Sequence, residues 1–221
     1  MSPTDPHLHH ADAPDETESL WGRLLTMAVT ALAAGLMAII LVYKVRVMLS
    51  QQRWDMLGLV AFYTLLITLF IIRKPTQLSL ASFPHWLVAL GGTLTPLALQ
   101  TTTVSVGLLK WLGHGVEIIG VIASVWSLAT LGRGFGIVAA ERSIKTHGVY
   151  RWVRHPLYAS EYCWMWGLLL QHFSWVNVGV AVVALLFQIA RMNDEERLLS
   201  NNPTYASYLA TVRWRLLPGI Y

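Results

Sequence analysis

Residues 148–158 read Gly-Val-Tyr-Arg-Trp-Val-Arg-His-Pro-Leu-Tyr and lie between two apolar segments. Proline disfavours a helical conformation at the residue before it and lacks the N–H group of its own helical turn. We therefore expect Pro156 to open a helix, with Arg154 and His155 just ahead of the first turn. The unpaired N–H groups and the positive dipole end of such a helix favour an anionic ligand group. This stretch is thus a candidate binding segment.

The composition of the whole chain is that of a membrane protein. Its 221 residues are 55% hydrophobic and 13% charged, whereas soluble domains carry about 25% charged residues. Apolar runs approach the length that crosses a bilayer, so the sequence predicts an all-α, polytopic transmembrane helical bundle of about 5–6 spans. The expected apolar segments are 24–43, 56–72, 86–99, 104–131, 156–170 and 175–190.

The distribution of charge predicts orientation and excludes one class of partner. The formal net charge is +4, but the basic residues flank apolar runs, so the positive-inside rule explains the excess and we expect no nucleic acid partner. The interval 132–155 is the most basic, which predicts that it faces the cytoplasm. Alternating spans then place Lys44, Arg46 and Arg53 on the other side, against the same rule.

Three regions are expected along the chain. Residues 1–20 are polar and acidic, which predicts a disordered tail. Residues 21–127 are expected to form N-terminal transmembrane helices, and residues 128–221 carry the candidate chemistry. An acidic tail is unlike the basic start of a signal peptide. The compact length without a targeting signal is typical of a bacterial inner-membrane protein with its site facing the cytoplasm.

A helical hairpin is expected after Pro156. The sequence Gln-His-Phe-Ser at 171–174 turns the chain, and the segment that follows returns it to the face from which it came. Glu195 and Glu196 would then lie close to Arg154 and His155. Such a mixture of cations and carboxylates suits a zwitterionic ligand that carries a carboxylate, an ammonium group and hydroxyls.

Ordered motifs in this region resemble a known family. Gly-x-Tyr-x-x-x-Arg-His-Pro-x-Tyr at 148–158 is followed by Arg-x-x-x-Glu-Glu at 191–196 and by a tyrosine-rich ending with Arg-x-x-Pro at 215–218. Over roughly residues 128–219 the chain resembles the isoprenylcysteine carboxyl methyltransferase family and, more loosely, the phospholipid N-methyltransferases. The resemblance implies an integral-membrane methyltransferase that uses S-adenosylmethionine.

The resemblance also implies a set of site residues. Cofactor binding is expected at Tyr150, His155, Pro156, Tyr158, Glu195 and Glu196, and Gly132 and Gly134 look like the Gly-x-Gly element of the phospholipid methyltransferases. The rings of Tyr150, Trp152 and Tyr158 could cover the adenine or lie near the sulfonium. For Tyr150 and Trp152, anchoring at the membrane interface is the alternative.

Methyl transfer from a sulfonium requires alignment, exclusion of water and charge balance. We therefore expect neither a metal nor a nucleophilic triad. Arg154, placed to hold a substrate carboxylate or to balance charge, and Glu196 are the candidate catalytic residues. Arg213 and Arg215 are interpreted as basic residues that face lipid phosphates, with recognition of a substrate carboxylate as the alternative.

Several alternatives stay open. The methyl acceptor is expected to be lipophilic or small: most simply the carboxylate of a prenylated cysteine, otherwise a thiol, a lipid amine or another hydrophobic carboxylate. An NADPH-dependent membrane reductase related to sterol reductases is a second hypothesis, although such proteins are generally longer. A non-enzymatic scaffold is a third, although buried charge without a ligand is costly.

Two further features have competing interpretations. His114 and Glu117 share a helix face in an apolar segment, which favours an interhelical pair over a polar relay. Residues 205–215 are typical of a short amphipathic helix at the membrane interface.

Overall fold

The computed structural model describes residues 20–52, 57–72, 83–100, 107–134 and 144–221. Over these residues the chain is helical, as the sequence predicts. The α-helices are α1 (Leu20–Ser50), α2 (Leu57–Ile72), α3 (Phe83–Leu94), α4 (Leu108–Leu131), α5 (Pro156–Gln171), α6 (Trp175–Leu199) and α7 (Pro203–Thr211). Short 3-10 turns follow α3 (Thr95–Ala98), follow α4 (Gly132–Gly134) and precede α5 (Gly148–Arg151). Residues 1–19 of the tail predicted at 1–20 lie outside the described residues, and Leu20 is the first residue of α1.

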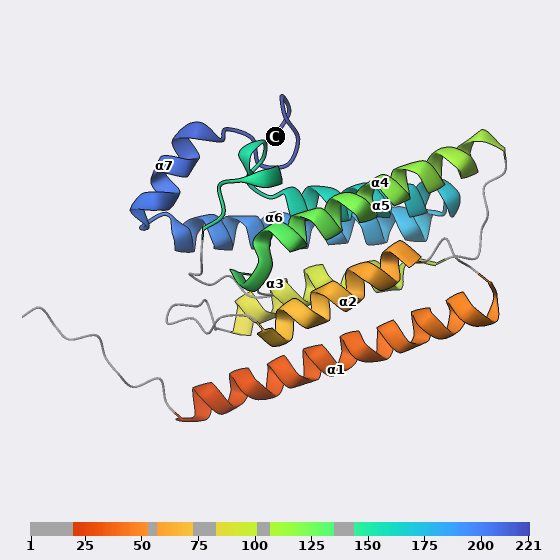
Figure 1. Ribbon diagram of the computed structural model, residues 1–221, viewed down its shortest axis with the longest axis horizontal. Helices are drawn as coiled ribbons and strands as arrows, with labels where there is room; N and C mark the ends of the chain where they lie inside the picture. Colours follow the sequence, from red (N-terminus) through yellow and green to blue (C-terminus); the bar gives the residue numbers. More distant parts are fainter. Residues whose placement is uncertain (1–19, 53–56, 73–82, 101–106, 135–143) are drawn as a thin grey trace, which may run out of the picture.

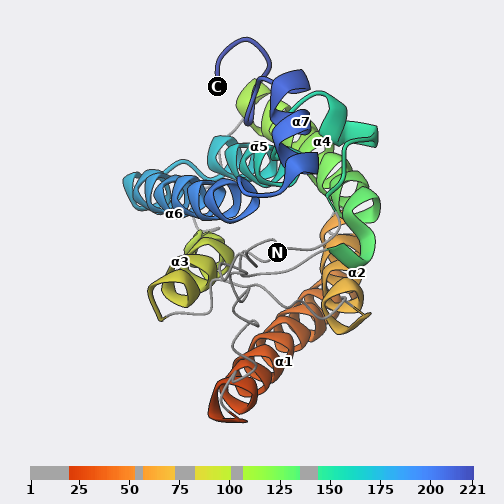
Figure 2. The ribbon, with the colours of Figure 1, turned by 90° about the vertical axis from the view of Figure 1, so that its left-hand side faces the viewer.

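The long helices lie side by side, and α7 sits at one end of the bundle with the C-terminal segment (Figure 1). Seen along the bundle, α2 lies between α1 and α4, while α3 lies beside α6 (Figure 2). The closest neighbours are α4 and α5. The bundle therefore places the start of α5 and the end of α6 at the same end of the molecule as α7.

Three of the described helices contain segments long and apolar enough to cross a membrane: Ala31–Ser50, Leu108–Leu131 and Trp175–Leu199. The others are shorter than the roughly 20 residues that a span needs, with 16 residues in α2, 12 in α3 and 16 in α5. The predicted segment 86–99 is helical only to Leu94, and a 3-10 turn that contains Pro96 continues it. The described helices thus give three candidate spans, and the predicted total of five or six stays a prediction.

Close backbone contact joins α4 to α5, and we call this contact the α4–α5 seam. A Cβ atom at Gly120 would lie 2.3 Å from the backbone nitrogen of Trp164, and one at Gly167 would lie 2.4 Å from that of Glu117. Ser124 Oγ donates to Ser160 Oγ at 2.9 Å across the seam. Small residues that let helix backbones touch are the usual basis of helix association in membranes, where lipid is as apolar as the protein core.

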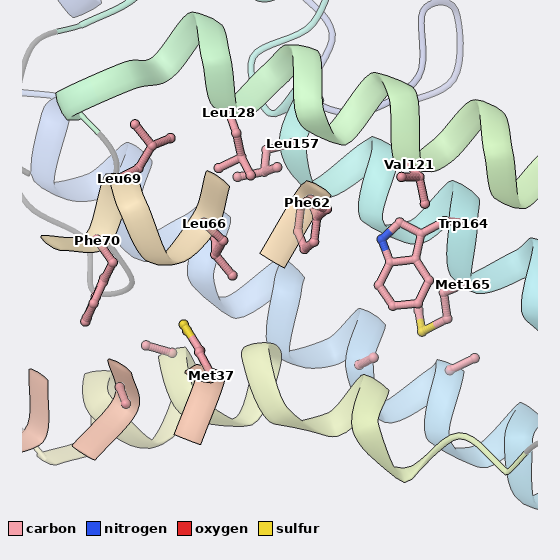
Figure 3. Close-up of a cluster of buried hydrophobic side chains, with 14 residues drawn as sticks. Met37, Phe62, Leu66, Leu69, Phe70, Val121, Leu128, Leu157, Trp164 and Met165 are labelled. Atoms are coloured by element: carbon pink, nitrogen blue, oxygen red, sulfur yellow. The ribbon is translucent and has the colours of Figure 1, made fainter. Parts of the chain in front are cut away.

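An apolar core extends from this seam to α1 and α2. Figure 3 shows Val121 and Leu128 of α4, Trp164 of α5 and Phe62 of α2 in one buried cluster. Leu128 has no exposed surface. The cluster fixes the α4–α5 unit against the N-terminal helices.

The hairpin forms where the sequence predicts it. α5 begins at Pro156, and the Ser174 hydroxyl caps α6 by accepting a hydrogen bond from the Asn177 N–H group. α6 runs beyond the apolar segment to Leu199, so the Arg-x-x-x-Glu-Glu motif lies within the helix. α7 ends at Thr211, four residues before the predicted limit at Arg215, because the next residues pair with the start of α5.

Candidate functional site

The hairpin brings the two predicted motifs together. His155 Nε2 lies 3.1 Å from Glu196 Oε1, and Arg154 Nη1 donates to the same oxygen at 3.2 Å. His155 Nδ1 lies 3.6 Å from Glu195 Oε2, and the Tyr158 hydroxyl donates to Glu195 Oε1. The predicted meeting of Arg154-His155 with Glu195-Glu196 is therefore confirmed, while the role of each residue in binding stays a prediction.

Arg154 also binds the segment that follows α7. Its Nε donates to the Val212 carbonyl at 2.9 Å, and its Nη2 donates to the Arg213 carbonyl at 2.8 Å. The backbone N–H groups of Arg154 and His155 donate to the carbonyls of Trp214 and Arg215, both at 2.9 Å. Every guanidinium nitrogen of Arg154 thus has a protein partner, which fixes residues 212–215 over the start of α5.

Glu196 is the carboxylate on which these contacts converge. Besides Arg154 and His155, it accepts a hydrogen bond from Arg215 Nη2 at 2.6 Å. Arg215 also donates to the Tyr221 hydroxyl at 2.8 Å. Burial alone would lower the pKa of Arg215, but its hydrogen bonds to Glu196 and Tyr221 raise the pKa overall. Arg215 therefore belongs to the site, where the sequence had favoured a contact with lipid phosphates.

Aromatic rings line the same region. The His155 and Tyr158 rings are stacked with centroids 5.6 Å apart, and the Arg191 guanidinium lies 4.9 Å from the Tyr158 ring centroid. Tyr150 is buried, and its carbonyl accepts a hydrogen bond from the Tyr208 hydroxyl at 2.6 Å. Burial raises the pKa of both tyrosines, so their hydroxyls stay protonated. Tyr150 thus supports the turn that precedes α5.

The remaining predicted residues are placed differently. Pro156 is buried at the first position of α5. Gly132 and Gly134 form the 3-10 turn that follows α4 and packs against α2 and α4. The Trp152 side chain is half exposed, and its ring lies edge to face against Trp126 with the ring centroids 6.1 Å apart.

His114 Nδ1 lies 3.8 Å from Glu117, which accepts a hydrogen bond from Gln171 of α5 at 2.8 Å. This geometry favours the interhelical pair.

A further polar group, which the motifs did not include, lies beside these residues. Gln188 Nε2 donates to Glu161 Oε2 at 2.7 Å, and Glu161 is close enough to Arg191 and Glu195 to interact with both electrostatically. Its signal in the sequence was a lone carboxylate three residues after Tyr158, on the same face of an apolar helix.

The residues present suit a zwitterionic cofactor. No side chain caps the N-terminus of α5, where the Arg154 guanidinium adds positive charge. The carboxylates of Glu195 and Glu196 face this end from α6. An anionic group is favoured at an uncapped helix N-terminus, and an ammonium group or hydroxyls are favoured by carboxylates.

Comparison with known families agrees with this chemistry. Residues 108–207 match the sequence model of the phospholipid methyltransferase family, from the start of α4 through the hairpin into α7. No curated protein matches the chain significantly. The matched family is related to the isoprenylcysteine enzymes, and the specific resemblance to those enzymes stays a prediction. Residues 108–207 are thus similar to a phospholipid methyltransferase domain, and the chain is a membrane methyltransferase that uses S-adenosylmethionine.

Proposed function

We propose that S-adenosylmethionine binds between the start of α5 and the end of α6, and that the methyl acceptor is a lipophilic molecule that enters sideways from the bilayer. The observation that carries this proposal is the meeting of Arg154 and His155 with Glu195 and Glu196 at the ends of the hairpin. Both ends lie inside the matched region 108–207.

The cofactor contacts follow from the charges. The α5 N-terminus and His155 would hold the cofactor carboxylate, and Glu195 would hold its ammonium group or ribose hydroxyls. The Tyr158 ring would lie near the sulfonium or the adenine. When bound, the cofactor supplies a methyl carbon that the positive sulfur has already activated.

Arg154 and Glu196 are proposed to act at the same place through charge balance. Their mutual contact, and the hydrogen bonds of Arg154 to Val212 and Arg213, support a role in holding residues 212–215 over the cofactor. Tyr150 would contribute by supporting the turn before α5. Gly132 and Gly134 would provide close backbone approach near the cofactor.

The placement in the membrane is part of the proposal. The basic interval 132–155 favours a site at the cytoplasmic face. With α2, α3 and α5 crossing the bilayer as short or tilted helices, the bundle would have up to six spans. Both the carboxylate of a prenylated cysteine and a lipid amine are acceptors that sideways entry would allow.

Calorimetry on the detergent-purified protein tests the cofactor site. S-Adenosylmethionine and its demethylated product should bind the parent protein, and His155→Ala and Glu196→Ala should abolish this binding while the bundle stays folded by circular dichroism. His114→Ala is the matched control, since this histidine also faces a glutamate but lies on α4, outside the proposed site. Unchanged affinity in both site variants would refute the assignment. Binding of NADPH alone would point to the reductases.

A further inference from the structure

We propose that Tyr221 is a positioning residue that keeps residues 213–221 closed over the proposed cofactor site. It does so by holding Arg215 on Glu196, and the cofactor enters and leaves only while this contact is broken. We call residues 213–221 the C-terminal flap. The inference rests on the proposed function and deepens it, because it states what controls exchange of the cofactor at the same site.

The sequence of the C-terminal flap folds it back on itself. Residues 217–220 form a turn in which the last N–H group donates to the first carbonyl at 3.1 Å. Gly219 has a φ of 88°, and a proline followed by a glycine is the usual central pair of such a type II turn. The returning chain places the main-chain oxygen of Tyr221 where it accepts hydrogen bonds from the N–H groups of residues 215–217, at 2.9, 2.8 and 3.0 Å. Backbone hydrogen bonds therefore fix Tyr221 beside Arg215.

The Tyr221 side chain then fixes the direction of Arg215. Arg215 Nη1 donates to the Tyr221 hydroxyl at 2.8 Å and to Asn193 Oδ1 at 3.2 Å, while its Nη2 donates to Glu196 Oε2 at 2.6 Å. The guanidinium also lies 5.5 Å from the centroid of the Tyr221 ring, close enough for attraction between a cation and a ring. Because a guanidinium is rigid and planar, a partner on one side sets its contact with Glu196 on the other.

The C-terminal flap lies at the proposed entrance of the cofactor. The carbonyls of Trp214 and Arg215 accept hydrogen bonds from the backbone N–H groups of Arg154 and His155, both at 2.9 Å. These contacts lie directly before the first turn of α5, which is proposed to hold the cofactor carboxylate. A ligand that enters between α5 and α6 at this end would therefore have to displace the flap.

Little apolar burial holds the C-terminal flap in place. Its residues are exposed or half-buried, and Leu217 and Ile220 are 52% and 77% exposed. The loop projects from the outside of the bundle (Figure 1, Figure 2). Val212, directly before the flap, is buried against α7 and is the natural pivot. Segments with few buried apolar contacts open locally at low cost in free energy, so the polar contacts of Arg215 decide how often the flap opens.

Such a device has a kinetic signature. Where the closed flap dominates in both the free and the bound protein, a weaker contact raises the open population in both. Association and release then become faster by the same factor, and the dissociation constant is unchanged. Tyr221→Phe keeps the ring and removes the hydroxyl. It should raise both rates by about tenfold, as expected for the loss of one hydrogen bond to a charged group.

Exchange of labelled S-adenosylhomocysteine, the demethylated product, tests the inference on the detergent-purified protein. We would measure its association and release in the parent, Tyr221→Phe, Arg215→Gln and the double variant. Arg215→Gln should also raise both rates, and Tyr221→Phe should add nothing to it, because the tyrosine acts through the arginine. Tyr162→Phe is the matched control, since this hydroxyl donates to the Ala181 carbonyl at 2.8 Å, within the hairpin. Its rates should equal those of the parent.

Trypsin provides a second readout that needs no ligand. Arg213 is exposed at the start of the C-terminal flap, so cleavage after it reports the open state, and should be faster in Tyr221→Phe than in the parent. The inference is overturned if Tyr221→Phe exchanges the product at the parent's rates, or if its effect persists in Arg215→Gln. Weaker affinity without faster association would also overturn it. A parent that binds neither S-adenosylmethionine nor its product refutes the proposed function itself.

Discussion

Two glutamate–glutamine pairs join neighbouring helices of this bundle, and their surroundings differ. Glu117 of α4 pairs with Gln171 of α5, whose Nε2 also donates to the Gly167 carbonyl at 3.1 Å. The backbones touch here, since a Cβ atom at Gly113 would lie 2.8 Å from the same carbonyl. This pair is enclosed by helix backbone.

The second pair leaves one hydrogen-bond acceptor without a partner among the described residues. Glu161 of α5 binds Gln188 of α6, but Gln188 Oε1 is buried without a partner among the described residues. The charged neighbours of Glu161 include Arg191 and the proposed cofactor residue Glu195. The comparison indicates that a glutamate–glutamine pair is structural where helix backbone encloses it. The same pair is a candidate binding site where an acceptor atom has no partner and charged residues lie nearby.

The largest effect should come from separating the backbones of the α4–α5 seam. Gly120→Val would place a Cβ atom 2.3 Å from the Trp164 backbone nitrogen, where rotation of a side chain gives no relief. We expect the free energy of unfolding to fall by about 3 kcal/mol or more. Unfolding in detergent, followed by circular dichroism, measures this. Gly115→Val is the control on the same helix, because nothing lies within 4 Å of a Cβ atom there. Equal loss in both variants would show that the seam is looser than described.

Replacing either of the two glutamines should lower the free energy of unfolding by less than Gly120→Val does, and the two replacements should differ from each other. Gln171→Leu removes the donor to Glu117, whose side chain is only 15% exposed, and should cost about 1–3 kcal/mol of unfolding free energy. Gln188→Leu should cost less, because Glu161 keeps its interaction with Arg191 and a buried unsatisfied oxygen disappears. The same unfolding assay compares the two variants. A greater loss for Gln188→Leu would mean that the α5–α6 pair is the structural one.

The smallest effect concerns the serine pair of the α4–α5 seam. Ser124 Oγ donates to Ser160 Oγ, which in turn donates to the Leu157 carbonyl at 2.7 Å. A double-mutant cycle with Ser124→Ala and Ser160→Ala should give a coupling free energy of about 0.6 kcal/mol, as hydrogen bonds between membrane helices usually do. A coupling near zero would assign the stability of the seam to backbone packing alone.

Local chemistry made the hairpin predictable. Pro156 allows the start of α5 to be located, and the polar turn at 171–174 separates two apolar segments. Because a hairpin returns the chain to the same face, the meeting of His155 with Glu196 followed without knowledge of the packing. The span count was less predictable, because the apolar length of a segment does not state where its helix ends.

Tertiary contacts decided what the sequence could not show. Residues 212–215 have a helical pattern but pair with the start of α5, where Arg154 holds their carbonyls. Arg215 turns inward for the same reason and binds Glu196. The interest of Glu161 became apparent only from its hydrogen bond with Gln188, a residue 27 positions away in the chain. No periodicity along α5 or α6 specifies that contact.

The hydrogen bonds between Arg154 and residues 212–213 join positions 58 and 59 apart in the chain. Both helices of the hairpin, which end at Leu199, are therefore translated before the segment that covers the start of α5. A nascent chain halted after α6 would lack the contacts of Val212, Arg213 and Arg215 and would present an incomplete site. The contacts over the start of α5 thus form only when the C-terminal segment of the chain has been made.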